Sequence, residues 1–137
     1  MNYGKSIRLH TAFADTADRV RRALKDQGFG VLTEVDVRAA MREKLGEDME
    51  DYVILGACNP PLAHRALQAD RRIGLLPCNV VIRADGDQAI VEALDPQVMA
   101  GVTGRDELSP VAAEAAARPE GALAWLRTHA GSTGQEE

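Results

Sequence analysis

Two Cys-Asn dipeptides hold the side chains of this chain that are best suited to chemistry. Cys58-Asn59 is followed by two prolines and then by His64, and Cys78-Asn79 begins a second apolar run. A cysteine thiolate is a nucleophile and a soft-metal ligand. An asparagine amide can cap a helix, or orient a carboxylate or carbonyl group of a ligand. We therefore treat five residues as the candidate ligand-binding site: Cys58, Asn59, His64, Cys78 and Asn79.

The positions of the two cysteines suggest that they could meet. Cys58 lies just before a predicted helix, whose positive N-terminal end favours a thiolate. Cys78 lies at the start of a predicted strand, so the two thiols would be close together if their strands are neighbours. His64 lies roughly one and a half turns into the helix. A Cys58/His64/Cys78 cluster is therefore compatible with the spacing.

Three interpretations of this cluster remain open. In the first, it binds a small ligand or a soft metal. In the second, Cys58 is a nucleophile for redox or sulfur chemistry and Cys78 resolves it, although the chain lacks a Cys-x-x-Cys motif. In the third, both cysteines are small buried hydrophobes, Asn59 is only a helix cap and His64 is a surface residue. A closed zinc site needs four ligands and only three are found, so neither a metal nor another cofactor is assigned.

Composition indicates an ordinary globular chain. The 137 residues are 45% hydrophobic and 27% charged, with a net charge of −5. This size fits a single domain, which we place at residues 1–130. The acidic balance argues against nucleic-acid binding. No stretch approaches the roughly 20 apolar residues of a membrane span, and the N-terminus lacks the apolar core of a signal peptide. We expect a cytoplasmic protein with reduced thiols and no membrane partner.

Hydrophobic periodicity and turn residues predict the following elements. Strands are expected at 7–11, 29–35, 52–58, 76–83 and 88–94. Helices are expected from an Asp15 N-cap to Gly28, and at 37–45, 60–70 and 110–129.

Local signals set the boundaries of several of these elements. Asp36 is expected to cap the second helix and Gly46 to end it. Asp85-Gly86 predicts a hairpin between the last two strands. A loop then leads to Ser109-Pro110, an N-cap with a proline at the first helical position. Pro119 and Gly121 are expected to kink or split the last helix, and residues 131–137 to form a disordered polar tail.

This order of elements favours an α+β fold, in which a curved antiparallel sheet carries helices packed on one face. The strands at 52–58 and 76–83 are apolar on both faces, so each needs cover above and below. We expect a second copy of the chain to supply that cover, as a homodimer.

Three sequence blocks resemble the domain of unknown function 302 family. They are Asp51–Pro60 with its Gly-Ala-Cys-Asn-Pro motif, Ala63–Leu67, and Ile73–Val80 with its Leu-Pro-Cys-Asn motif. The resemblance covers roughly Lys5 to Arg127. It implies a fold like that of the TATA-box-binding protein, with the order β-α-β4-α, and a dimer. It implies no established activity, and likeness of fold does not bring DNA binding with it.

From these observations we expect a small homodimeric binding module, with a small ligand or soft metal near the two Cys-Asn motifs. The alternative is a thiol-dependent redox or sulfur-handling protein that uses Cys58 and Cys78. Whether the chain is an enzyme stays open at this point.

Overall fold

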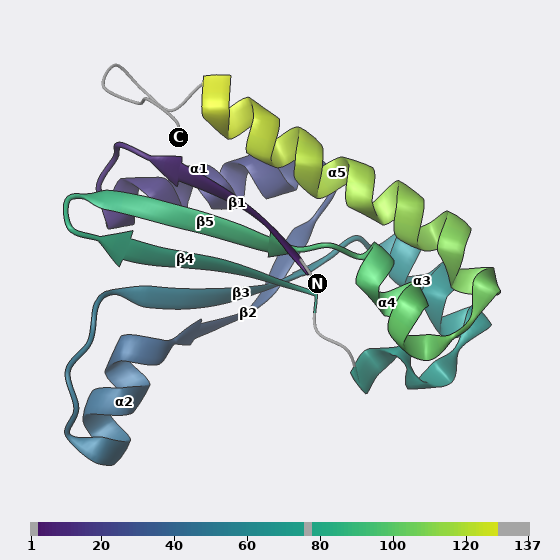
Figure 1. Cartoon of the computed structure of the whole chain (residues 1–137), viewed down its shortest axis with the longest axis horizontal. Coiled ribbons are helices and arrows are strands. Elements are labelled where there is room, and N and C mark those ends of the chain that lie inside the picture. Colours follow the sequence, from purple (N-terminus) through teal and green to yellow (C-terminus); the bar gives the residue numbers. More distant parts are fainter. Residues whose placement is uncertain (1–2, 76–77, 129–137) are drawn as a thin grey trace.

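A five-stranded antiparallel sheet forms the centre of the molecule (Figure 1). The computed structural model describes residues 3–75 and 78–128. The strand order is β1-β5-β4-β3-β2, and every neighbouring pair is antiparallel. The strands are β1 (Gly4–Leu9), β2 (Gly30–Asp36), β3 (Tyr52–Cys58), β4 (Asn79–Asp85) and β5 (Gln88–Leu94). The predicted α+β fold with an antiparallel sheet is confirmed.

In the described part of the chain, five α-helices and two short 3-10 helices complete the fold. The α-helices are α1 (Phe13–Asp26), α2 (Val37–Leu45), α3 (Pro60–Ala69), α4 (Gln97–Thr103) and α5 (Ser109–Thr128). The 3-10 helices are η1 (Arg71–Leu75) and η2 (Asp106–Leu108). Among the residues that the structure describes, no helix is long and apolar enough to cross a membrane.

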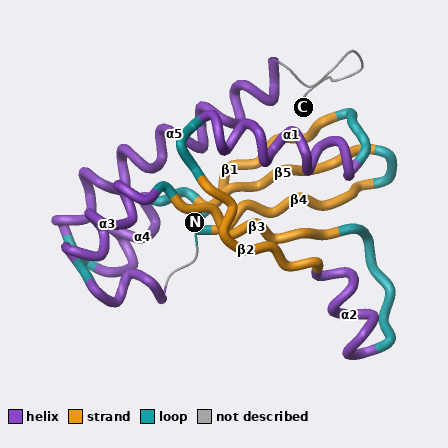
Figure 2. Tube along the Cα trace, turned by 180° about the vertical axis from the view of Figure 1, so that it is seen from behind, coloured by secondary structure: helices purple, strands orange, loops and turns teal. Residues whose placement is uncertain are grey.

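The main core lies between one face of the sheet and the helices α1 and α5. Along β3 the side chains of Val53, Leu55 and Ala57 are buried against the helices, whereas the alternate residues stay partly exposed. This alternation follows from the two-residue period of a strand. Figure 2 shows the same arrangement from behind, with α1 and α5 on one side of the sheet. No helix of the described residues forms a layer on the other sheet face.

Helix α1 confirms the helix predicted from hydrophobic periodicity and corrects its predicted start. Ala17, Val20 and Leu24 are all buried in the core. The helix begins at Phe13, and Ala12 occupies the cap position without a side-chain hydrogen bond. The predicted N-cap at Asp15 was therefore wrong. Asp15 lies in the first turn instead, where a carboxylate still interacts favourably with the helix dipole.

Helix α2 extends away from the rest of the molecule beyond the edge strand β2 (Figure 1). Its predicted boundaries are confirmed: Asp36 Oδ1 accepts a hydrogen bond from the backbone N–H of Ala39 at 2.9 Å, and Gly46 ends the helix with φ of 68°. None of its residues is buried. Packing within one copy of the chain therefore does little to hold α2 in place.

Helix α5 runs without a break from Ser109 to Thr128, so the predicted split near Pro119 and Gly121 was wrong. Ser109 is already helical, with φ of −57° and ψ of −46°, because α5 continues directly from η2. Gly121 has a packing role: a Cβ atom there would lie 3.1 Å from the Gln27 side chain at the end of α1. The glycine lets α1 and α5 approach closely.

The segment between β5 and α5 differs from the predicted loop because it contains α4 and η2. Helix α3 is likewise followed by η1, which was not predicted. The hairpin at Asp85-Gly86 is present, with Gly86 at φ of 64°. The predicted strand start at Leu76 and the predicted tail at 131–137 lie outside the described residues.

Candidate functional site

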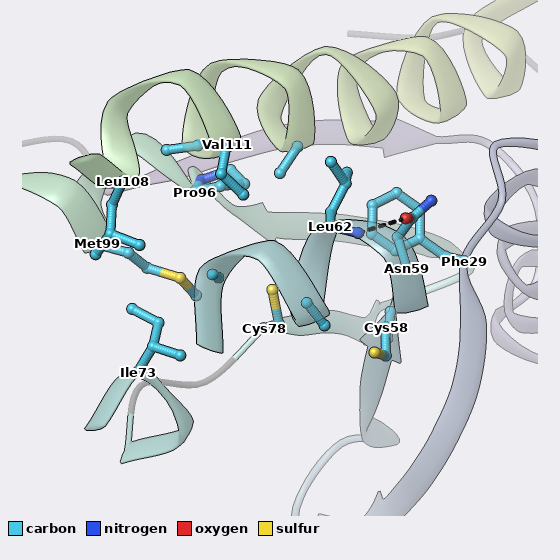
Figure 3. Close-up of a pocket in the computed structure, with 15 residues that line it drawn as sticks. Phe29, Cys58, Asn59, Leu62, Ile73, Cys78, Pro96, Met99, Leu108 and Val111 are labelled. Atoms are coloured by element: carbon cyan, nitrogen blue, oxygen red, sulfur yellow. Dashed lines mark hydrogen bonds between the residues drawn. The ribbon is translucent and has the colours of Figure 1, made fainter. Parts of the chain in front are cut away.

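Asn59 is one of two buried polar residues in the described part of the chain, with 7% of its surface exposed. Its Oδ1 accepts a hydrogen bond from the backbone N–H of Leu62 at 3.2 Å and so caps α3 (Figure 3). Its Nδ2 donates to the backbone carbonyl of Gly28 at 3.1 Å, in the turn after α1. One amide therefore connects the end of α1 with the junction of β3 and α3.

Two glycines make this junction sterically feasible. A Cβ atom at Gly28 would lie 2.9 Å from Nδ2 of Asn59, and the residue has φ of 84°, which other residues rarely adopt. Gly56 lies against the bulge of β2, where a Cβ atom would overlap Oγ1 of Thr33. The Gly-Ala-Cys-Asn segment thus joins the sheet edge to the turn after α1.

The cysteines of the two Cys-Asn dipeptides lie on opposite faces of the sheet. Gly56 pairs with Asn79, and the backbone N–H of Ala57 donates to the carbonyl of Cys78 at 3.1 Å. Cys78 therefore shares the helix-covered face with the buried Ala57, whereas Asn79 shares the open face with Gly56. Strand alternation puts Cys58 on the open face as well. Figure 3 shows the sulfur of Cys78 directed toward the helices and that of Cys58 directed away from them.

Both cysteines are free thiols. Burial among apolar groups raises the pKa of Cys78, and a negative charge on the neighbouring Cys58 raises it further. The residue as a whole is exposed, so the desolvation acts on its inward-facing sulfur. At neutral pH Cys78 is a neutral thiol, which is a poor nucleophile and a weak metal ligand.

A cavity of about 170 Å³ lies between α3, α5 and the end of the sheet. Its helical walls are formed by small and branched apolar side chains: Leu62, Ala63, Ala66, Val111, Ala112 and Ala115. An ion pair between Arg65 and Glu114, with 2.5 Å between Nη1 and Oε2, connects α3 with α5.

The two ends of the cavity are formed by different parts of the chain (Figure 3). Ile73 of η1, Met99 of α4 and Leu108 of η2 form one end. Phe29, Cys58 and Asn59 lie at the other, with Cys78 and Pro96 between them. The side-chain amide of Asn59 is already hydrogen-bonded to the backbone of Leu62 and Gly28. The exposed lining of the cavity is therefore almost entirely apolar. Such a surface binds apolar groups and holds no charged ligand on its own.

The predicted site residues separate into three groups. Cys58, Asn59 and Cys78 line the cavity. Asn79 lines a small neighbouring cavity and a polar hollow on the open face with Tyr52. His64 is exposed and is not among the cavity residues. Within the described ranges, no three His, Cys, Asp or Glu side chains are arranged to hold a metal.

The sequence reasoning missed most of the cavity wall. Ile73, Met99 and Leu108 belong to short elements that were not predicted. Ala112 and Ala115 lie in the predicted helix at 110–129, but no role in a cavity was assigned to them. The available signal was the run of small residues on the helices 60–70 and 110–129, because facing alanines leave unfilled space where helices converge.

Comparison with known proteins agrees with this geometry. The family model described as "Domain of unknown function DUF302" matches residues 5–126. The chain is similar to the crystal structure of an uncharacterized conserved protein DUF302 from Bacillus stearothermophilus, with 28% sequence identity and a TM-score of 0.83. The match covers 90% of this chain and 98% of that one. No curated protein matches the chain.

Replacing Asn59 with alanine is expected to lower the free energy of unfolding by about 1–3 kcal/mol, because the backbone N–H of Leu62 and the carbonyl of Gly28 both lose a partner. Urea unfolding followed by circular dichroism measures this loss. Asn79→Ala in the other dipeptide is the matched control, since Asn79 is half-buried and makes no side-chain hydrogen bond to a described residue. Equal losses in the two variants would contradict the joining role of Asn59.

The thiol of Cys78 is expected to ionise at a higher pH than an ordinary cysteine. In the variant Cys58→Ser its pKa should fall slightly, because the neighbouring charge is removed, yet stay raised, because desolvation is the larger cause. Thiolate ultraviolet absorbance against pH measures both effects. A Cys78 pKa at or below the ordinary value in this variant would contradict the apolar position of its sulfur.

Proposed function

The chain belongs to the family of the domain of unknown function DUF302, and from the geometry of its site we propose that it is a binding module for a small apolar molecule or group. The ligand would occupy the cavity between α3, α5 and the sheet end. Phe29 just before β2, Cys78 just before β4 and Met99 in α4 would contact it from three separate parts of the chain.

The cavity lining is the observation that carries this proposal. Its surface is apolar on every side, and apolar cavities of about 150 Å³ stay free of water and accept a molecule of the size of benzene. At about 170 Å³ this cavity is similar in size, and it is partly open to solvent, so a ligand can enter it from the surface. An apolar ligand that fills it would remove apolar surface from water and, by binding the folded state, stabilise it.

The thiol and metal alternatives have less support. The two sulfurs point in different directions (Figure 3), and Cys78 is a neutral thiol at physiological pH. A soft metal held by Cys58 and Cys78 would have to draw further ligands from outside the cluster, because His64 does not line the cavity. We place the protein in the cytoplasm in this proposal, where both thiols would stay reduced.

Filling the cavity tests the binding function. Ala115→Phe is expected to weaken the binding of 1-octanol by about tenfold or more, because the new ring occupies the space of the ligand. Isothermal titration calorimetry measures the affinity. Ala113→Phe on the exposed side of α5 is the matched control and should bind as the unchanged protein does. Absence of octanol binding to the unchanged protein, or unaltered binding in Ala115→Phe, would contradict the proposal.

We further propose that the open sheet face pairs with the same face of a second copy. Ile54, Val81 and Val35 present partly exposed apolar side chains there. The charged residues of this face are already paired within the chain, with 3.0 Å between Arg83 Nε and Glu92 Oε1. A face with paired charges can be buried without leaving isolated ions. A two-fold axis would bring like faces together.

Projecting helix α2 gives the second reason for this dimer. It has no buried residue, and Leu45 at its end has 67% of its surface exposed. A partner on the open face would bring new contacts to this side of the molecule. Stable dimers typically bury about 800 Å² per partner, which the area of a five-stranded sheet can provide.

Ile54→Arg is expected to convert the dimer into a 14.7 kDa monomer, because a guanidinium at the centre of the interface would be buried without a partner. Light scattering after size-exclusion chromatography measures the mass. Val102→Arg, at an exposed apolar residue of α4, is the control and should remain dimeric. A monomeric unchanged protein at micromolar concentration would contradict the homodimer.

A further inference from the structure

A further hollow, of about 290 Å³, is lined by residues of η1 and α4 and of the segments that flank them. It combines two guanidinium groups with two apolar side chains that are unusually exposed: Leu75 at 76% and Val102 at 63%. The remaining lining residues are Asp70, Arg72, Thr103 and Arg105. A surface of this composition suits a molecule that is apolar at one end and anionic at the other.

Two elements that line one end of the cavity, η1 and α4, also line the hollow. Arg72 and Leu75 flank Ile73 in η1, and Val102 and Thr103 lie about one turn after Met99 in α4. Ile73 and Met99 form one end of the apolar cavity (Figure 3). The ion pair between Asp70 and Arg105, at 3.6 Å, joins the α3–η1 side to the α4–η2 side at the hollow. The elements that form this end of the cavity with Ile73 and Met99 therefore also form the hollow with their neighbouring residues.

One positive charge in the hollow, that of Arg72, is not balanced by a carboxylate of the hollow. Asp70 is nearly buried, with 10% of its side chain exposed, and its charge is balanced by Arg105. Its Oδ1 also accepts a hydrogen bond from the backbone N–H of Arg72 at 2.9 Å. The guanidinium of Arg72 has no ion-pair partner among the described residues. Arg72 is therefore available to an anion from outside the chain.

We propose that the cavity and the hollow form one site for a short-chain alkyl carboxylate. The alkyl chain, of about six carbon atoms, lies in the apolar cavity, and the carboxylate accepts hydrogen bonds from Arg72, next to Arg105. Planar guanidinium groups match the geometry of a carboxylate. This inference depends on the proposed apolar-binding function and adds the chemical class of the ligand.

Octanoate and 1-octanol test this assignment, because they share the alkyl chain and differ in the head group. Calorimetric titrations of both ligands are compared between the unchanged protein and Arg72→Gln. The substitution is expected to weaken octanoate binding roughly three- to tenfold, through loss of a charged hydrogen bond, and to change octanol binding less than about twofold. Added salt should weaken octanoate binding alone.

Neighbouring substitutions control for general effects of charge. Arg71→Gln removes an equal charge from an exposed residue that does not line the hollow, and should leave octanoate affinity unchanged. Arg72→Lys should retain part of the preference for octanoate over 1-octanol, since it keeps the positive charge. Both residues are exposed, so the variants are expected to fold.

The outcomes distinguish the carboxylate assignment from the apolar-binding function on which it depends. Loss of octanoate affinity in Arg72→Gln, with octanol and Arg71→Gln unaffected, supports the carboxylate site. If octanol binds and is blocked by Ala115→Phe, while Arg72→Gln affects both ligands equally or neither, the carboxylate assignment is overturned and the apolar-binding function stands. If neither ligand binds the unchanged protein, both are overturned.

Discussion

The position of the candidate site depends on one buried amide. Asn59 is satisfied only where the N-terminus of α3 and the carbonyl of Gly28 meet. A buried amide without such partners costs more than most surface interactions contribute. This constraint sets the direction in which α3 leaves the sheet, and with it the wall that Leu62 and Ala66 give to the cavity. The close approach at Gly28 is the steric counterpart of the same constraint.

Features that depend on local chemistry could be predicted from the sequence. The apolar stripe of α1, the cap at Asp36 and the glycine turn at Gly86 each depend on a few neighbouring residues. Asn59 was also predicted as a cap. Its second bond, to Gly28, joins residues far apart in the chain, and no pattern in a single sequence indicates that contact.

Other features depend on packing between distant segments and so were mispredicted. Pro119 and Gly121 carry strong helix-breaking signals, yet α5 continues through them, because its burial against α1 outweighs the local cost. Gly101 within α4 and Gly104 directly after it lowered the helical signal of this segment. His64 was grouped with the cysteines by its spacing, but the turn of α3 leaves it exposed.

Composition explains why a cavity remains at this site. Aromatic residues make up only 4% of the chain, and the helices that meet near the sheet end contribute mainly alanines, such as Ala63 and Ala112. Alanine lets two helix backbones approach closely, but it cannot fill the wedge where a third element diverges. Strand alternation then directs the sulfur of Cys78 toward the helices and that of Cys58 away from them, although each cysteine precedes an asparagine. Both residues still line the cavity, so the register of β3 and β4, rather than the motif itself, determines which of them turns its sulfur toward the helices.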